Sequence, residues 1–294
     1  MSQATKTALL AVLIYAAFNL LLPLIPLPAH RPPAALLFLI VVVPTAAFML
    51  LQLWLALSLV NLRLRPALAG LAAVISISLW IVILFLIHPH FGLTHTANFA
   101  LYLLRQFLLG LAVTFAATFL GITLSPIVRE INVLLPVALV AMPIDYLGAM
   151  TPMGFTQNMV SQHPQFVQAL SVAVPKIGGV RHGGLHPIGF IGPGDVLFLA
   201  FFFAIVLRLN LNVKGTFWIM YGLLTATLLI VILPGGINIA ALIPMGLAVL
   251  IANWRYFKLK RDEVFATIYA GIVVIALASA FYAYSHVHFF HSRS

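Results

Sequence analysis

The chain has 294 residues, of which 63% are hydrophobic and only 7% are charged. A soluble domain carries about 25% charged residues, so this composition excludes a water-facing globular protein and predicts a membrane protein. The formal net charge of +10 does not indicate a nucleic-acid partner, because the basic residues lie mostly in short loops between apolar runs, where they contact lipid headgroups of the bilayer. Cysteine is absent, which excludes disulfides, thiol catalysis and thiolate metal sites.

Apolar runs of about 20 residues predict membrane-spanning helices. We therefore expect an all-α, polytopic transmembrane helix bundle that forms a single integral membrane domain over residues 1–294. The nine predicted helices cover residues 7–27, 35–60, 66–87, 99–124, 131–150, 194–207, 215–233, 237–253 and 264–284. The first run lacks a small-residue cleavage site, so we expect it to remain as an anchor. The longest connection, about 151–193, is rich in Gly, Pro and polar residues.

The distribution of Lys and Arg predicts the orientation of the bundle. With nine spans, the N-terminus and the even-numbered loops share one side, which carries ten basic residues: Lys6, Arg63, Arg65, Arg129, Arg208, Lys214, Arg255, Lys258, Lys260 and Arg261. The opposite side carries four: Arg31, Lys176, Arg181 and Arg293. Because basic residues concentrate on the cytoplasmic side, we expect a cytoplasmic N-terminus and an extracytoplasmic 151–193 loop.

All ten histidines also fall on the predicted outer side, at positions 30, 88, 90, 95, 163, 182, 186, 286, 288 and 291. Two glycines separate His182 from His186 within that loop, so these residues do not form a helical pair of metal ligands. We expect solvated interfacial histidines and no metal site.

Two of the five acidic residues lie in apolar sequence. Glu130, Asp262 and Glu263 stand beside basic residues at helix ends. Asp145 lies 16 residues after Arg129, about 24 Å along a helix, and Asp195 lies 13 residues before Arg208, about 20 Å. The two helices run antiparallel, so the carboxylates are expected to meet at similar depth.

Such a pair suits the activation of water. Two adjacent carboxylates cannot both ionise easily, so one holds a proton. One Asp then takes a proton from water while the other protonates the scissile carbonyl. Other interpretations stay open on these grounds: Asp195 as a helix N-cap, and Asp145 as a proton or cation site in a transporter or as a partner of Arg105.

Local motifs extend the argument. Gly192-Pro193-Gly194-Asp195 matches the Gly-x-Gly-Asp motif of the presenilin and signal peptide peptidase families, and Asp145 occupies the place of their other catalytic aspartate. The stretch that begins at Asp145 and ends in Thr-Pro-Met-Gly is similar to their pattern of Asp, a short apolar run and Pro-x-Gly. Downstream, the family motif Pro-Ala-Leu is replaced by Ala241-Leu242-Ile243, with Pro244 following. The resemblance covers about residues 131–253.

The resemblance implies a presenilin-like catalytic half and a cofactor-free intramembrane aspartyl protease that cleaves transmembrane or signal-peptide segments. Asp145 and Asp195 would be catalytic, and six residues would contact the substrate: Gly192, Gly194, Ala241, Leu242, Ile243 and Pro244. The chain departs from the family at Ile144, where Tyr or Phe is usual, and in having four predicted helices rather than five before Asp145.

Three alternatives stay open. The first is a proton-coupled transporter or channel that uses Asp145. The second is a processing enzyme similar to the prepilin peptidases, which share the Gly-x-Gly-Asp motif but have a cytoplasmic active site. The third is a non-catalytic family member that binds substrates without cleaving them. The predicted orientation resembles that of signal peptide peptidase, so type II single-pass segments and signal peptides are the expected substrates of a protease.

Overall fold

The computed structural model describes residues 2–26, 33–86, 99–150, 164–178, 180–181, 184–185, 187–232, 240–258 and parts of 260–280. The chain forms two compact units. The first comprises Met1–Leu124 and Gln168–Ala204, and the second comprises Ser125–Val167 and Ile205–Ser294. Two of the three boundaries between the units fall within helices, at residues 167–168 and 204–205.

Helices occupy eight of the nine predicted runs in the described part of the chain. The ninth run, 264–284, lies partly outside it, although the described residues from 264 to 280 are helical. Three short 3-10 helices adjoin the others: η1 Leu22–Leu24, η2 Ser125–Ile127 and η3 Trp254–Tyr256. The α-helices at the predicted runs are α1 Gln3–Leu21, α2 Ala34–Val60, α3 Pro66–Leu86, α4 Phe99–Leu124, α5 Ile131–Met150, α8 Pro193–Arg208, α9 Val213–Ile232 and α10 Leu242–Asn253.

Within the described residues, six helical segments are long and apolar enough to cross a membrane. These are Gln3–Leu24, Phe38–Val60, Pro66–Phe85, Leu103–Ile127, Ile131–Gly148 and Val213–Ile232. With 16 and 12 residues, α8 and α10 extend about 24 Å and 18 Å, short of a hydrocarbon core about 30 Å thick. The chain is therefore a multi-pass integral membrane protein.

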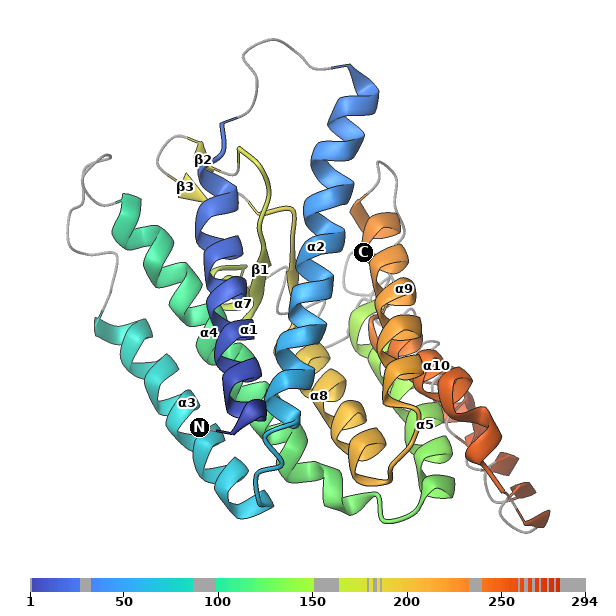
Figure 1. Ribbon diagram of the computed structural model, residues 1–294. Helices are drawn as coiled ribbons and strands as arrows, with labels where there is room; N and C mark the ends of the chain where they lie inside the picture. The colour runs from blue at the N-terminus through green and yellow to red at the C-terminus, as the bar shows by residue number, and fades with distance from the viewer. Residues whose placement is uncertain are drawn as a thin grey trace, which may run out of the picture. The chain divides into compact units, whose positions relative to one another are not determined.

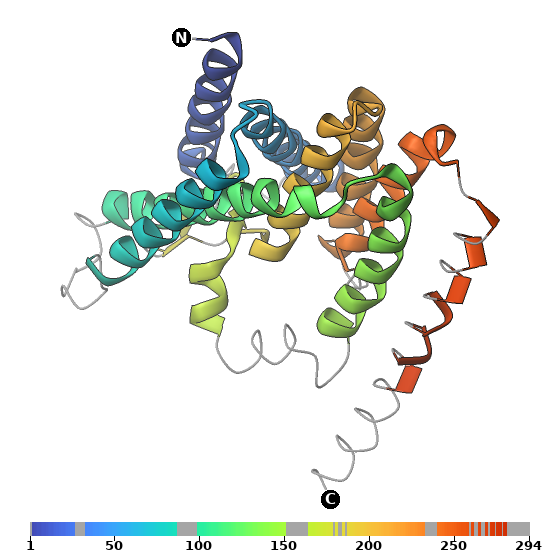
Figure 2. The same ribbon diagram turned by 90° about the horizontal axis from the view of Figure 1, so that it is seen from below.

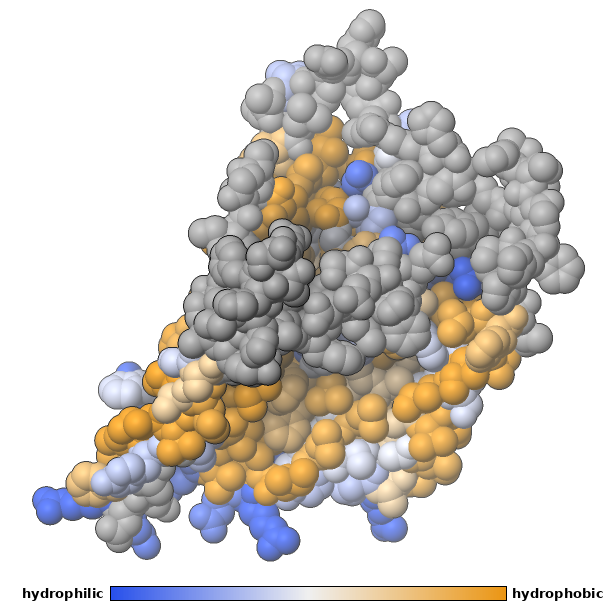
Figure 3. Space-filling view, turned by 180° about the vertical axis from the view of Figure 1, so that it is seen from behind, coloured by the Kyte–Doolittle hydropathy of each residue, from blue (hydrophilic) through white to orange (hydrophobic). Residues whose placement is uncertain are grey.

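The surface of the helices is apolar, as a lipid environment requires. Phe85 is 68% exposed, and Leu71 and Ile251 are more than half exposed. Hydrophobic residues cover most of the described surface in Figure 3. In water such a surface would aggregate, whereas in a bilayer it is the expected outer face of a helix bundle.

In the first unit, α4 is the central contact element. It packs against α1, α2 and α3, and Figures 1 and 2 show α3 lying alongside it. Lipid tails are as apolar as Leu, so close approach of the backbones, permitted by small residues, holds membrane helices together. Eight alanines of these helices are buried accordingly: Ala8, Ala11, Ala56, Ala69, Ala73, Ala112, Ala116 and Ala117.

The connection between α5 and α8 contains secondary structure that the sequence analysis did not predict. A short helix, α7 (Pro164–Leu170), precedes two antiparallel ribbons. In one, β1 (Val172–Val174) pairs with β4 (Gly189–Ile191), with Val172 opposite Ile191; in the other, β2 (Val180–Arg181) pairs with β3 (Gly184–Leu185). β1 and β3 contact α4, so the ribbons belong to the first unit and lead directly into α8.

In the second unit, α10 packs against both α5 and α9. A buried amide joins the start of α9 to the end of α10: Asn253 Oδ1 accepts the N–H of Asn212 at 2.9 Å, and Asn253 Nδ2 donates to Thr216 Oγ1 at 2.9 Å. The turn before α9 includes Asn210 at a positive φ of 52°, which Asn tolerates better than most residues. These contacts fix the α9–α10 pair at one end.

Candidate active site

Asp145 lies near the C-terminal end of α5 and is half-buried. Its Oδ2 atom accepts a hydrogen bond from the backbone N–H of Leu242 at 2.9 Å. Leu242 is the first residue of α10, and the first N–H groups of a helix have no partner within the helix. Within the described residues, this is the one hydrogen bond to the Asp145 carboxylate, and it joins Asp145 to the segment that the motifs predict to bind substrate.

The close approach of α10 to α5 makes this contact possible. Met142, one turn before Asp145, faces Gly246, one turn after Leu242. A Cβ atom at Gly246 would overlap the methyl group of Met142 and lie 3.3 Å from its Cγ. The methyl end of Met142 therefore fills the space beside Gly246, and the same antiparallel register brings Leu242 to Asp145.

The predicted substrate-binding residues 241–244 form the beginning of α10. Ala241 is the residue before the helix, Leu242 and Pro244 are buried, and Ala241 and Ile243 are half-buried. Pro244 has no N–H, and it stands in the first turn, where a helix tolerates proline. The N–H of Ile243 donates to Ala240 O at 3.2 Å. Among the residues that the structure describes, the acceptor of the Leu242 N–H is therefore the Asp145 carboxylate.

Asp195 is the third residue of α8, after Pro193 and Gly194. Its Oδ2 atom accepts the N–H of Gly192, the residue before the helix, at 3.1 Å. This is the contact that the third helical residue makes in a capping box. The sequence analysis considered Asp195 as the N-cap residue itself; the structure instead has Gly192 there, with proline in the favoured first position.

The two glycines of the motif have different surroundings. A Cβ atom at Gly192 would lie 3.3 Å from Asp195 Oδ2, tighter than most such contacts, whereas nothing lies within 4 Å of a Cβ atom at Gly194. Gly192 also follows directly after β4. The carboxylate of Asp195 is therefore held where a strand becomes a helix, beside a residue whose small size keeps its approach open.

The structure thus brings Asp145 together with Leu242 in the second unit, and Asp195 together with Gly192 in the first. Because the aspartates belong to different units, their pairing stays a prediction, as does an ion pair between Asp145 and Arg105 of the first unit. The ten histidines, the Thr151–Gly154 part of the motif and Gly235-Gly236 lie outside the described residues. Sequence reasoning missed the Leu242 N–H, because a backbone donor leaves no mark in residue identities.

Comparison of the chain with protein-family models, with curated proteins and with solved structures finds no match.

Proposed function

We propose that the protein is an intramembrane aspartyl protease of the presenilin-like, Gly-x-Gly-Asp type, with Asp145 and Asp195 as its catalytic pair. The observation that carries the proposal is the hydrogen bond from Leu242 N–H to Asp145 Oδ2. It joins one predicted catalytic residue to the segment predicted to bind substrate, across 97 positions of sequence.

The contact orients Asp145 for water activation. Oδ2 is engaged by Leu242, which leaves Oδ1 to accept a proton from a water molecule. That water attacks the carbonyl carbon of the scissile bond while the protonated Asp195 donates a hydrogen bond to the carbonyl oxygen. Asp145 then passes the proton it took from water to the leaving nitrogen as the tetrahedral intermediate collapses, which breaks the C–N bond and leaves a carboxyl and an amine terminus. No cofactor is needed.

A substrate helix must unwind first, because its amides are engaged in its own hydrogen bonds. We propose that the unwound strand pairs with β4 (Gly189–Ile191). Within the described residues β4 pairs with β1 alone, so its other edge offers backbone donors and acceptors of the kind that bind extended peptides. β4 ends beside Gly192 and Asp195, and a strand paired there would run toward the catalytic carboxylate.

We further propose nine spans with a cytoplasmic N-terminus, in which α8 and α10 are short helices within the bundle. In this orientation the loop between the aspartates is extracytoplasmic. Type II single-pass segments and leftover signal peptides then cross the membrane in the N-to-C direction that the site requires.

Replacement of the carboxylates by amides tests the proposal. Asp145→Asn and Asp195→Asn each retain a side-chain oxygen that accepts the observed N–H, but neither provides the acid–base chemistry. With the purified protein and a single-pass type II substrate in lipid vesicles, each variant should lose cleavage at least 100-fold. Glu130→Gln, which changes an exposed acid at the start of α5, is the matched control and should cleave normally. Cleavage retained by either aspartate variant would rule out the pair.

A proton-coupled transporter or channel is the second candidate, favoured by one observation. Asp145 is the one carboxylate inside the six candidate spans of the described chain, and carboxylates at such positions commonly carry protons or ions. This function predicts proton-dependent flux in sealed vesicles that Asp145→Asn abolishes, with no proteolysis. A binding protein without catalysis would instead retain the substrate uncleaved.

A further inference from the structure

Four polar side chains are buried on α1, α2 and α4 of the first unit. They are Tyr15 on α1, Gln52 on α2, and Thr114 and Thr118 on α4. Tyr15 is 2% exposed, Gln52 1%, and both threonines 0%. Such groups are costly in the interior of a membrane protein unless their hydrogen bonds are satisfied.

Three of these side chains lack partners within the described part of the chain. The Tyr15 hydroxyl, the Thr118 hydroxyl and both polar atoms of the Gln52 amide make no hydrogen bond there. Thr114 Oγ1 donates to Gly110 O at 2.9 Å. Thr114 and Asn19 face the Tyr15 hydroxyl without reaching hydrogen-bond geometry with it.

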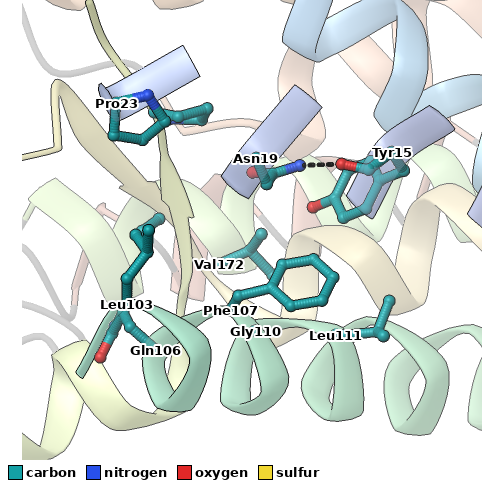
Figure 4. Close-up of a pocket in the computed structure, with 11 residues that line it drawn as sticks. Tyr15, Asn19, Pro23, Leu103, Gln106, Phe107, Gly110, Leu111 and Val172 are labelled. Atoms are coloured by element: carbon teal, nitrogen blue, oxygen red, sulfur yellow. Dashed lines mark hydrogen bonds between the residues drawn. The ribbon is translucent and has the colours of Figure 1, made fainter. Parts of the chain in front are cut away.

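Tyr15 also borders a pocket. It lies between α1, α4 and β1, has a volume of about 30 Å³, and is bordered by Asn19, Gln106 and Gly110. Figure 4 shows the Tyr15 hydroxyl directed into the space between Asn19 and Phe107. One water molecule needs about 10–15 Å³ measured in this way, together with polar partners. The pocket has both the volume and the polar side chains that a water molecule requires.

The remaining polar groups continue from the pocket into the bundle. The ring of Tyr15 contacts that of Phe48 at a centroid distance of 6.0 Å. Gln52 follows Phe48 by one helical turn, and Thr118 follows Thr114 by one turn, so each lies on the same face as its predecessor. α2 and α4 run in the same direction (Figure 1). Gln52 and Thr118 are therefore displaced from Phe48 and Thr114 in the same direction along the bundle. From Gln106 to Thr118 the distance along α4 is about 18 Å.

We infer that the pocket and the polar side chains beyond it hold bound water, in a hydrated track that enters beside Asn19 and Gln106 and ends at Gln52 and Thr118. Water both donates and accepts, so it satisfies the two hydroxyls and both ends of the Gln52 amide. The residues that border the pocket carry no formal charge, which favours a neutral occupant over an ion. The inference does not depend on proteolysis.

The absence of cysteine permits a direct test of water access. A thiol is oxidised by hydrogen peroxide, a molecule little larger than water, through its thiolate, which forms only where water reaches it. Thr118→Cys is nearly isosteric, and Ala117→Cys is its matched control on the next residue, also buried. In native membranes, position 118 should react at least tenfold faster than position 117. Equal rates would overturn the inference.

Tyr15→Phe supplies a second readout that involves no thiol. A hydroxyl bonded to water contributes to stability, so its removal should lower the Tm in detergent. A dry, unpaired hydroxyl is a cost, so its removal would raise the Tm and contradict the hydrated track. Tyr269→Phe, at an exposed position, controls for the substitution itself and should leave the Tm unchanged.

Discussion

At the residue scale, each predicted catalytic aspartate also has a structural contact. Asp145 accepts the first N–H of α10, and Asp195 accepts the N–H before α8. Interactions of this kind stabilise a helix end by about 0.5–2 kcal/mol. They explain why each carboxylate is held in place, and they also mean that a loss of activity on substitution must be separated from a loss of folding.

Asp145→Ala and Asp145→Asn make that separation. The alanine variant leaves the Leu242 N–H without its partner and should lower the free energy of unfolding by about 1 kcal/mol. The asparagine variant keeps an acceptor oxygen and should lose much less. Thermal or denaturant unfolding in detergent measures both. Equal destabilisation would mean that the charge of Asp145, rather than its hydrogen bond, holds the beginning of α10.

The sequence singles out Asp145 and Asp195 as candidates but does not predict their contacts. Asp145 and Asp195 stand out because carboxylates in apolar runs are rare. In contrast, the partner of Asp145 is a backbone group 97 positions away, and which backbone groups meet depends on packing. Gly246 was the available signal: a glycine one turn after Leu242 predicts a close helix approach, although not against which helix.

At the element scale, the long apolar runs predicted the helices well, and short irregular segments were not predicted. α4 and α5 have the predicted bounds, and the other helices at the predicted runs differ from prediction by a few residues at one or both ends. The ribbons were missed because strands of two or three residues are too short to show a period. In retrospect, Val172–Val174 and Gly189–Ile191 contain the β-branched and aromatic residues typical of strands.

The position of α8, and with it Asp195, depends on one glycine of α4. A Cβ atom at Gly121 would lie 2.5 Å from Leu197 O and 2.8 Å from Phe201 N, both backbone atoms of α8. Gly121→Ala therefore forces the two helices apart and should cost about 1–3 kcal/mol. We expect a lower Tm together with reduced cleavage, measured on the same preparation.

Gly222→Ala is the control, because nothing lies within 4 Å of the added Cβ atom on the exposed face of α9. It should leave stability unchanged or raise it by up to about 1 kcal/mol, since alanine is the better helix former. A Gly121→Ala protein as stable and active as Gly222→Ala would mean that α8 does not depend on this close approach.

At the scale of the whole molecule, orientation separates the candidate enzymes. Single cysteines at Ser2 and at Gln168, both exposed, are to be treated in intact cells with a membrane-impermeant thiol reagent. With a cytoplasmic N-terminus, position 168 should react in intact cells and position 2 only after lysis. The reverse pattern would place the loop between the aspartates in the cytoplasm, which is the side on which prepilin peptidases act.

The pairing of the two units is the remaining requirement of the proposed mechanism. If Asp145 and Asp195 share a proton and a water molecule, cysteines at both positions should be joined in native membranes by a short bifunctional thiol reagent, and by a disulfide if the Cα atoms come within about 7 Å. Asp145→Cys with Leu242→Cys is the positive control, since those residues are already in hydrogen-bond contact.

Each outcome of this crosslinking experiment has a definite meaning. Efficient joining of 145 to 195 places both carboxylates at one site and leaves amide substitution to test their chemistry. If 145 joins 242 but not 195, although each single cysteine reacts, then Asp195 serves as a helix-end residue of α8. Asp145 alone would remain as a membrane-embedded carboxylate, and proton-coupled transport would then account for it better than hydrolysis.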